Sequence, residues 1–280
     1  MNNGLSIRKS DFDTTFELQQ LVELQNEVYK ERGIVFSRED FKRWYIDNPF
    51  GKAISFNAFD GDCMAAHYVC IPTKMNIEGR VVDGIKSMAT VTHPNYRGKG
   101  LFKTLAKMTY DCARDMGYEF VIGVANANSF PGFMKYFPFV FVSQLEVKIG
   151  FGTHIEQDGE KTYSSYWDAD ALNWRTKCGG ANYCRGNNAI IGKYNNVVQT
   201  YMGGFPDSLL SATEIEKKGS PLIPKLYVGL GAKFNSHYFT VPKFVKHSPF
   251  NLIFQDLTDG KLPPITKDNT FFQLIDFDVA

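Results

Sequence analysis

The stretch from His93 to Phe102, HPNYRGKGLF, places a basic, glycine-rich turn directly before an amphipathic run. The N-terminus of a helix carries unpaired N–H groups and the positive end of the helix dipole. Glycines let a ligand approach those N–H groups closely. A strand, a basic glycine turn and a helix in this order predict either a solvated turn or a binding site for phosphate groups.

Two other phosphate-binding motifs are not met. The pattern G-x-G-x-x-G is absent, so the sequence does not support a dinucleotide-binding fold. GRVVDGIKS comes close to a Walker loop, but Ile85 separates Gly84 from Lys86 and no helical pattern follows directly.

The elements that would position this turn are predicted from hydrophobic periodicity. KSMATVTH, residues 86–93, is a predicted strand that ends at the turn. A single apolar helix face follows, made of Leu101, Leu105, Met108, Cys112 and Met116. Gly117 then ends the helix, and the apolar run FVIGVAN is typical of a buried parallel strand.

Upstream of the turn, the sequence predicts two helices and a hairpin. After the strand LSIRK, a helix is expected over residues 14–31. Ser37 can cap a second helix, with Asp40 three residues later as an imperfect capping box. AISFNAFDGDCMAAHYVCIP is a predicted hairpin that turns at Asp60-Gly61.

Downstream, SFPGFMKYF is predicted as a short helix or turn and VFVSQLEVKIG as a strand. From about residue 152 the content of glycine, asparagine and aromatic residues rises. The expected elements are a hairpin around Asn195-Asn196, a helix over 209–219 and strands in LIPKLYVGLG, FNLIFQDLTDG and FFQLIDFDV. We expect two closely packed α/β domains, residues 1–150 and 151–280.

The composition argues against several classes of protein. The chain has 280 residues, 44% of them hydrophobic, which suffices for a sizeable core. A net charge of +1 argues against a general nucleic-acid or membrane binder, which needs a basic field. Five cysteines without C-x-x-C predict no zinc site and no disulfide framework. The N-terminal segment has no apolar signal core, so a cytoplasmic protein is expected.

The order of VTHPNYRGKGLF, an amphipathic helix, FVIGVAN, Asn128 and PGFMKYFPF resembles the GNAT superfamily of CoA-dependent N-acyltransferases. The motifs cover about residues 88–140, and the order of elements extends the resemblance over roughly residues 1–150. The resemblance implies an α/β GNAT fold, a mixed twisted sheet flanked by helices. Arg97 and Gly100 match the family's loop pattern [Q/R]-x-x-G-x-[G/A], whereas Phe102 occupies its last position.

The resemblance also implies which residues hold acyl-CoA, the cosubstrate. The backbone of Thr90, Val91 and Thr92 would contact the pantetheine arm and the thioester carbonyl. Asn126 or Asn128 would bind pantetheine, with simple loop capping as the alternative. The pyrophosphate would be held by Arg97, Gly98, Lys99, Gly100, Leu101 and Phe102, whose ring must turn away.

The implied reaction is attack of a neutral amine on a thioester. An amine with a pKa of about 7.7–8.0 is partly neutral near pH 7, so a base would increase the rate only modestly. His93 is the candidate base, with capping of the turn as the alternative. Ser87, six residues earlier, is expected on the same face and would bind the acceptor amine or a water. Met134 stands where many family members have a tyrosine acid, and Tyr136 is two residues out of register.

Residues 151–280 lack R-x-x-G-x-G and are predicted to form a degenerate second GNAT-like domain that contributes to acceptor binding. KHSPFNLIFQDLTDG and FFQLIDFDVA resemble tandem-GNAT acyltransferases of bacterial surface-polysaccharide pathways. This resemblance implies a nucleotide-linked, typically dTDP-linked, amino sugar as acceptor. Candidate contacts to its base and phosphates are Trp174, Arg175, Tyr183, Arg185, Lys243, Lys246 and His247, with ordinary packing as the alternative.

Several alternatives stay open from the sequence. The acyl group is acetyl or of the hydroxybutyryl type. The acceptor is alternatively an aminoglycoside or another free amine, and a non-catalytic CoA-binding regulatory module is a further alternative. No metal, nucleic acid or membrane partner is expected, and the protein is predicted to be a monomer or a small homo-oligomer.

Overall fold

A computed structural model describes residues 4–178, 183–193, 195, 197–215, 219–220, 222–234, 237–241 and 248–277. The chain divides into two compact units. Unit 1 comprises Met1–Thr73, Asp83–Ile122 and Asp256–Gly260. Unit 2 comprises Lys74–Val82, Gly123–Gln255 and Lys261–Ala280. Both units combine strands and helices, so the predicted α/β class is confirmed.

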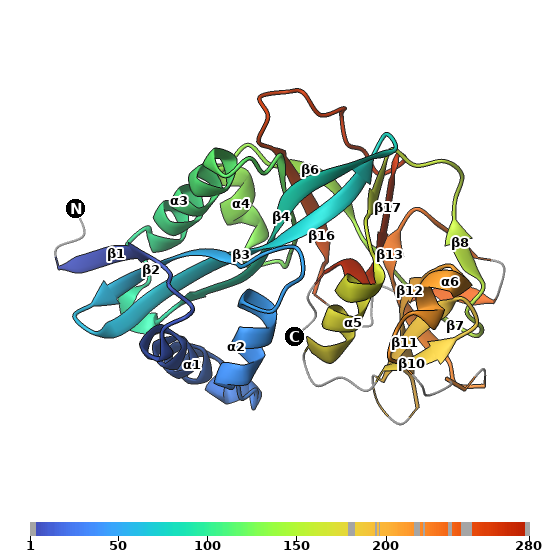
Figure 1. Cartoon of the computed structure of the whole chain (residues 1–280), viewed down its shortest axis with the longest axis horizontal. Coiled ribbons are helices and arrows are strands. Elements are labelled where there is room, and N and C mark those ends of the chain that lie inside the picture. The colour runs from blue at the N-terminus through green and yellow to red at the C-terminus, as the bar shows by residue number, and fades with distance from the viewer. Residues whose placement is uncertain are drawn as a thin grey trace. The chain divides into compact units, whose positions relative to one another are not determined.

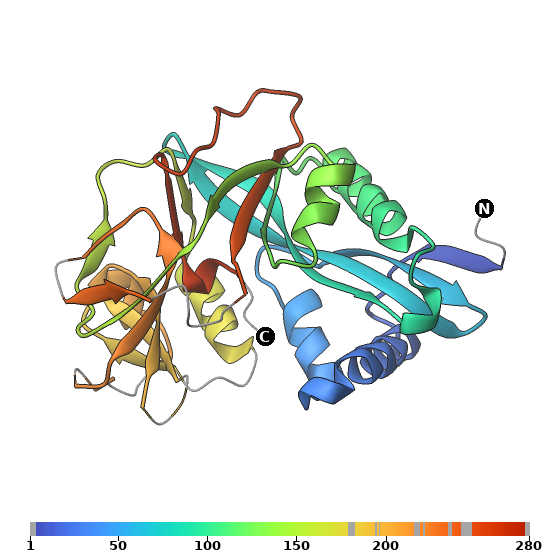
Figure 2. The same ribbon diagram turned by 180° about the vertical axis from the view of Figure 1, so that it is seen from behind.

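Unit 1 is a mixed sheet with helices on both faces. Its strands follow the order β1, β2, β3, β4, β5, with antiparallel pairing from β1 to β3 and parallel pairing of β4 with β5. In Figures 1 and 2, α1 and α2 lie on one side of these strands and α3 on the other. The bounds are β1 (Leu5–Lys9), α1 (Thr15–Tyr29), η1 (Lys30–Arg32), α2 (Arg38–Tyr45), β2 (Ile54–Asp60), β3 (Cys63–Ile77), β4 (Arg80–Thr92), η2 (Pro94–Tyr96), α3 (Leu101–Asp115) and β5 (Phe120–Ala125).

Two neighbouring residues of β3 show how the two faces of this sheet are used. The His67 ring lies 5.8 Å from the ring of Tyr45 on α2. The next residue, Tyr68, points the other way, and its ring lies 5.8 Å from that of Tyr110 on α3. Successive side chains of a strand point to opposite faces, so each helix layer packs on its own set of β3 side chains.

The start of α2 confirms the predicted capping box. The Ser37 hydroxyl accepts the Asp40 N–H at 3.2 Å, and the Asp40 carboxylate accepts the Ser37 N–H at 2.9 Å. Both bonds satisfy N–H groups that the first turn of a helix leaves without partners. The predicted α3 helix and its end at Gly117, with φ of 90°, are also confirmed.

Strands β3 and β4 are longer than the sequence pattern predicts. They form a hairpin through Glu78 and Gly79, whose φ angles of 49° and 78° suit the tight turns that join twisted strands. Asp83 and Gly84 are poor strand formers, which hid the first half of β4. Gly84 has a packing role, because a Cβ there would lie 2.4 Å from the Phe120 ring.

Unit 2 contains the remaining elements. One series of neighbouring strands runs β10, β11, β12, β13, β17, β9 and the end of β3; β7 also pairs with β13. The bounds are α4 (Phe130–Tyr136), β6 (Val140–Gln144), β7 (Glu146–Gly150), β8 (Ile155–Gln157), β9 (Tyr163–Ser165), α5 (Ala169–Lys177), β10 (Tyr183–Gly186), β11 (Ala189–Lys193), β12 (Gln199–Gly204), α6 (Asp207–Ser211), β13 (Lys225–Leu230), β14 (Ala232–Phe234), β15 (Tyr238–Thr240), β16 (Asn251–Asp256), β17 (Thr270–Gln273) and η4 (Leu274–Asp276).

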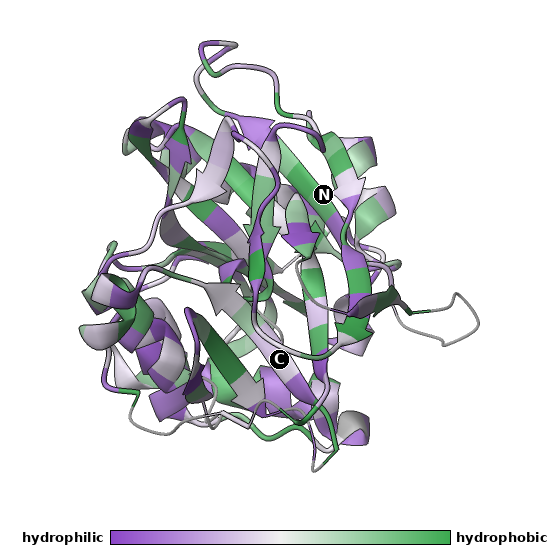
Figure 3. Ribbon diagram, turned by 90° about the vertical axis from the view of Figure 1, so that its right-hand side faces the viewer, coloured by the Kyte–Doolittle hydropathy of each residue, from purple (hydrophilic) through white to green (hydrophobic). Residues whose placement is uncertain are grey.

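Most predicted elements of the second half are found, with two corrections. The helix expected over residues 209–219 is wrong: α6 ends at Ser211, and the Thr213 hydroxyl donates to the Leu210 carbonyl at 2.7 Å, a local bond that competes with helix continuation. Helix α5, capped by Asp168, was not predicted. Figure 3 shows apolar residues concentrated in the strands, while the helices carry both polar and apolar positions.

Candidate active site

The loop between β4 and α3 has the geometry of an anion-binding site. Gly98 and Gly100 both adopt φ of 75°, and nothing lies within 4 Å of where their Cβ atoms would stand. Gly100 is the N-cap of α3, and no side chain caps this helix. The first intrahelical bond runs from the Thr104 N–H to the Gly100 carbonyl. The N–H groups of the first turn are therefore open to an anion.

Contacts within unit 1 hold this loop in place. The Tyr96 hydroxyl donates to Asp60, at the end of β2, at 2.7 Å, and this bond raises the pKa of the tyrosine. The His93 N–H donates to the Ala65 carbonyl of β3 at 3.0 Å. The Lys99 ammonium lies 4.9 Å from the centre of the Tyr96 ring. The backbone of the loop is thus tied to the sheet.

Arg97, Lys99 and Phe102 differ in how they relate to this loop. The guanidinium Nε of Arg97 lies 3.4 Å from the Thr92 carbonyl, and the side chain is exposed. Lys99 is exposed as well, so two cationic side chains flank the open helix N-terminus. The Phe102 ring packs edge-on against Tyr68 at 5.9 Å, on the sheet side of α3. Its bulk is directed at the sheet, and its backbone N–H belongs to the uncapped first turn.

The end of β4 extends beyond its pairing with β5. The register covers Gly84–Lys86 against Phe120–Ile122. Thr90 and Thr92 are half-buried and Val91 is buried, all in the stretch past this register. An extended ligand can hydrogen-bond to such backbone in the way that an added strand does.

The structure does not bring His93 and Ser87 to the same face. Ser87 hydrogen-bonds to the Tyr68 hydroxyl at 2.8 Å, and Tyr68 also bonds to Tyr110 of α3. His93 instead lines a cavity beside α1. Strand alternation fails because His93 follows the last residue of β4, where the chain turns into η2. Burial raises the pKa of Tyr68 and Tyr110, so the hydroxyl groups that bond to Ser87 and to one another stay protonated at neutral pH.

The ring nitrogens of His93 have different roles. The Asn95 N–H donates to Nδ1 at 3.2 Å, which is the turn-capping arrangement considered from the sequence. Because Nδ1 uses its lone pair as an acceptor, the neutral ring carries its hydrogen on Nε2. In that state Nε2 donates a hydrogen bond, and His93 can accept a proton only if the contact with Asn95 breaks.

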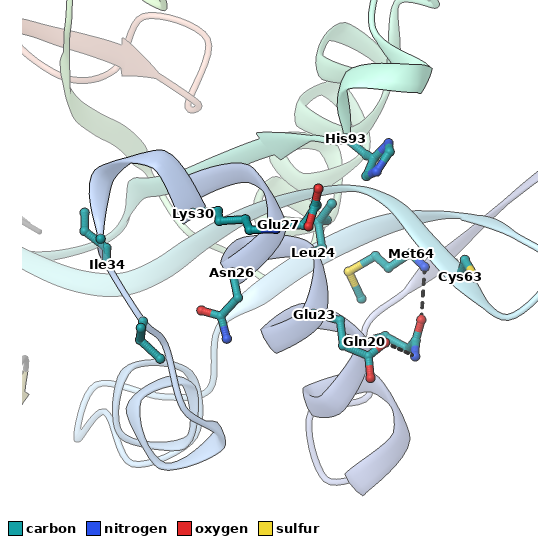
Figure 4. A pocket seen from close by; sticks show the side chains of 12 residues that line it. Gln20, Glu23, Leu24, Asn26, Glu27, Lys30, Ile34, Cys63, Met64 and His93 are labelled. Carbon is teal, nitrogen blue, oxygen red and sulfur yellow. Dashed lines mark hydrogen bonds between the residues drawn. The ribbon is translucent and has the colours of Figure 1, made fainter.

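A cavity of about 690 Å³ lies next to the loop, in unit 1 (Figure 4). It is lined by α1, η1, the chain that follows η1, the start of β3 and His93. Gln20, Glu23 and Glu27 come from one polar face of α1, and Gln20 accepts the Met64 N–H at 3.3 Å. In Figure 4 the Glu27 carboxylate projects toward the side of the cavity where His93 lies.

Sequence reasoning missed these acidic residues. Their only signal was the helical spacing of Gln20, Glu23 and Glu27, which puts three polar side chains on one helix face. Glu23 accepts hydrogen bonds from Gln19 and Gln20 at 2.9 and 3.0 Å. Two carboxylates, Glu23 and Glu27, and one ammonium, Lys30, line the cavity, so its lining favours a cationic or hydrogen-bond-donating ligand.

Asn126 and Asn128 lie in unit 2, at the start of α4. The Asn126 side-chain oxygen accepts the N–H groups of Asn128 and Ser129 at 2.9 and 3.0 Å, so loop capping accounts for it. Asn128 is exposed. Met134 and Tyr136 both belong to α4 and are 36% and 42% exposed, so no buried phenol stands in this helix.

The residues predicted to contact the nucleotide differ in their burial and in their hydrogen bonds. Arg175 is 3% exposed, and its guanidinium donates to the carbonyls of Ile275 and Phe277 and to Tyr183, so it is a packing residue and not a phosphate ligand. Trp174 is half-buried. Arg185 pairs with Asp207 at 3.1 Å. Lys243, Lys246 and His247 lie outside the described residues.

Comparison with known proteins shows what the first part of the chain is similar to. Residues 9–137 match the family model described as an acetyltransferase (GNAT) domain. This part of the chain is therefore similar to GNAT acetyltransferase domains. The match covers less than half of the 280 residues. Among curated proteins, no relative matches the sequence.

Two solved structures resemble the fold over most of the chain. A protein from Enterococcus faecalis V583, described as a "Probable N-Acyltransferase", shares 8% identity at a TM-score of 0.59, over 90% of this chain and 73% of that one. A GCN5-related N-acetyltransferase from Kribbella flavida shares 12% identity at a TM-score of 0.57, over 91% and 73%. At these identities the likeness shows the fold alone.

Two features are absent from the described residues, a membrane-spanning helix and a metal-binding cluster. No helix in this part of the chain has both the length and the apolar character needed to cross a membrane. Within the same residues, no three His, Cys, Asp or Glu side chains are grouped closely enough to hold a metal ion.

Proposed function

We propose that the protein is an N-acyltransferase that moves a short acyl group from acyl-CoA to the amine of a nucleotide-linked amino sugar. The loop Arg97–Phe102, in a part of the chain that matches a GNAT domain, is the observation that supports acyl-CoA as the donor. It joins two left-handed glycines, an uncapped helix N-terminus and two exposed cations. A pyrophosphate, with two negative charges, suits this combination.

In this proposal, the pantetheine arm lies along the end of β4. A backbone N–H of Val91 or Thr92 donates to the thioester oxygen and stabilises the oxyanion that forms there. The neutral amine attacks the thioester carbon, and a C–N bond forms. The C–S bond then breaks, the thiolate leaves with the bonding electron pair, and the amine loses one proton to yield an amide and CoA.

The cavity beside α1 is proposed to receive the amine. The carboxylates of Glu23 and Glu27 favour an ammonium ion. The volume of the cavity, about 690 Å³, suits a sugar-sized group. His93 donates through Nε2 to an oxygen of the acceptor. An amine with a pKa of about 7.7–8.0 supplies enough neutral form near pH 7 without a dedicated base. The nucleotide-linked form of the acceptor rests on the resemblance of the C-terminal segments, and residues 151–280 are proposed to contribute to its binding.

An acyl-transfer assay tests this proposal. Acetyl-CoA and hydroxybutyryl-CoA are each offered with dTDP-linked amino sugars, with the same amino sugars unlinked, and with an aminoglycoside. The expected result is transfer to the nucleotide-linked acceptors at the highest kcat/KM. Transfer only to free amines contradicts the nucleotide-sugar acceptor. CoA binding without turnover on any amine contradicts the enzyme and favours a regulatory module.

A further inference from the structure

Unit 2 contains a second cavity, of about 720 Å³, whose chemistry differs from that of the first. Its walls come from the chain after β7, the turn between β10 and β11, and the segments before β13. Ile191 and Ile215 give it an apolar side. Asn187 and Asn188, both exposed, and Thr153 give it a polar side. Its size falls within the range of small-molecule sites in proteins.

The ammonium of Lys225 is the unusual feature of this cavity. Lys225 is the first residue of β13 and is only 1% exposed. Its Nζ donates to the carbonyls of Ser220 and Ile223 at 3.0 and 2.8 Å. An ammonium has three N–H donors, so one remains after these two bonds.

No ion pair of Lys225 is found within the described part of the chain. The acidic residue that lines the same cavity is Asp207, and it is bound by Arg185 at 3.1 Å, which also donates to Ser211. The two charges of the Arg185–Asp207 pair cancel, and the positive charge of Lys225 remains. Burial lowers the pKa of this lysine, because it removes water from the ammonium.

A buried cation without a counter-charge destabilises a fold, and an anionic ligand relieves that cost. Among the described lining residues, one positive charge is in excess, and one negative charge matches it, which favours a carboxylate over a dianionic phosphate monoester. The amide groups of Asn187 and Asn188 suit hydroxyl groups on the same ligand. Ile191 and Ile215 suit its carbon skeleton.

We propose that this cavity binds a small organic acid that carries one carboxylate, of about the size of a sugar acid, with the carboxylate on the Lys225 ammonium. The residues that line this cavity all belong to unit 2, whereas the loop Arg97–Phe102 and the cavity beside α1 belong to unit 1. The proposed acyl transfer gives residues 151–280 a share in acceptor binding, but it places no group of the acceptor in this cavity.

Isothermal titration calorimetry with three probes tests the site on the full chain. Glucuronate carries the carboxylate, glucose lacks it, and glucose 6-phosphate replaces it by a phosphate dianion. The expected result is that glucuronate binds at least tenfold more tightly than glucose and glucose 6-phosphate. Equal binding of glucose overturns the role of the charge, and tighter binding of glucose 6-phosphate overturns the carboxylate class. Failure of glucuronate to bind overturns the proposal.

Two variants and a control locate the site. Lys225→Met removes the charge at nearly constant shape and should lower glucuronate affinity at least tenfold. Ile215→Trp fills the cavity from a half-buried position without altering the cation, and should lower it similarly. Lys233→Met removes an exposed lysine of β14 and should leave binding unchanged. Unchanged glucuronate affinity in Lys225→Met and Ile215→Trp overturns the assignment to this cavity, whatever the acyl-transfer assay gives.

Discussion

His67 should make the stability of unit 1 depend on pH. The imidazole is 1% exposed on β3, and its Nδ1 lies 2.7 Å from the Asn57 Oδ1. Asn57 uses its Nδ2 to donate to Ser10, so its Oδ1 is the acceptor and the His67 Nδ1 carries the hydrogen. The other ring nitrogen, Nε2, is buried and has no hydrogen-bond partner among the residues that the structure describes. Protonation would place a hydrogen and a charge on this isolated atom.

The magnitude follows from the pKa. Burial lowers the pKa of His67 from 6.5 to about 3. The unfolded chain therefore binds a proton as the pH falls below 6.5, while the folded chain does not until about pH 3. The free energy of unfolding falls with pH across this window, in full by about 5 kcal/mol at 1.36 kcal/mol per pKa unit. At pH 5 the loss is already about 2 kcal/mol.

Urea unfolding at pH 7.5 and pH 5.0, followed by fluorescence, measures this effect. His67→Asn keeps a donor near the position of Nδ1 and removes the titration. It should be less stable than the wild type at pH 7.5 because it leaves space in the core, but it should lose about 2 kcal/mol less on going to pH 5.0. His154→Asn, at an exposed histidine, is the control and should behave as the wild type. Equal pH-dependent losses in His67→Asn and the wild type would refute the reasoning.

Three further predictions concern the candidate active site. Gly100→Ala forces a side chain into a left-handed backbone, so it should cost about 1–2 kcal/mol in urea unfolding and weaken CoA binding; a variant with wild-type stability would contradict the strain. Glu27→Gln should raise the KM for an amine acceptor several-fold with the Kd for CoA unchanged, whereas the control Glu31→Gln, outside the cavity, should alter neither constant. His93→Gln keeps a donor near the position of Nε2 and should lose far less activity than the roughly 100-fold that removal of a general base costs; a loss of that size, with a flattened pH–rate profile, would make His93 the base.

The sequence predicted those parts of the fold that are governed by local chemistry. Ser37 and Asp40 form a capping box because both bonds lie within one helical turn. The apolar face that begins at Leu101 predicted α3, and the glycines before it predicted an open loop. Each of these features is determined by residues within a few positions of one another.

Features set by pairing across the chain were harder to predict. The first half of β4 contains Asp83 and Gly84, and it forms a strand because it pairs with its neighbours in the sheet. The alternation of side chains along a strand predicted that Ser87 and His93 share a face. This prediction was wrong because the alternation ends where the chain leaves β4, before His93. The cavity beside α1 joins Glu27 and His93, which are distant in sequence, so only the folded chain shows that they line one space.

The second GNAT-like copy in residues 151–280 stays a prediction. The fold likeness to two solved structures covers most of the chain, but the family model ends at residue 137. Residues 74–82 and 123–150 of the predicted first domain belong to unit 2, and residues 256–260 of the predicted second domain belong to unit 1, so the division at residue 150 describes a different partition of the chain.

The most direct test of the donor site is calorimetric titration of CoA and of pantetheine, which lacks the pyrophosphate, into the wild type, Arg97→Ala and Lys107→Ala. Lys107→Ala removes the same charge farther along α3 and is the control. Loss of a charged hydrogen bond worth about 1.5–3 kcal/mol should weaken CoA binding by about 10–100-fold in Arg97→Ala and leave pantetheine binding unchanged. Wild-type affinity of Arg97→Ala for CoA would contradict a pyrophosphate site in this loop.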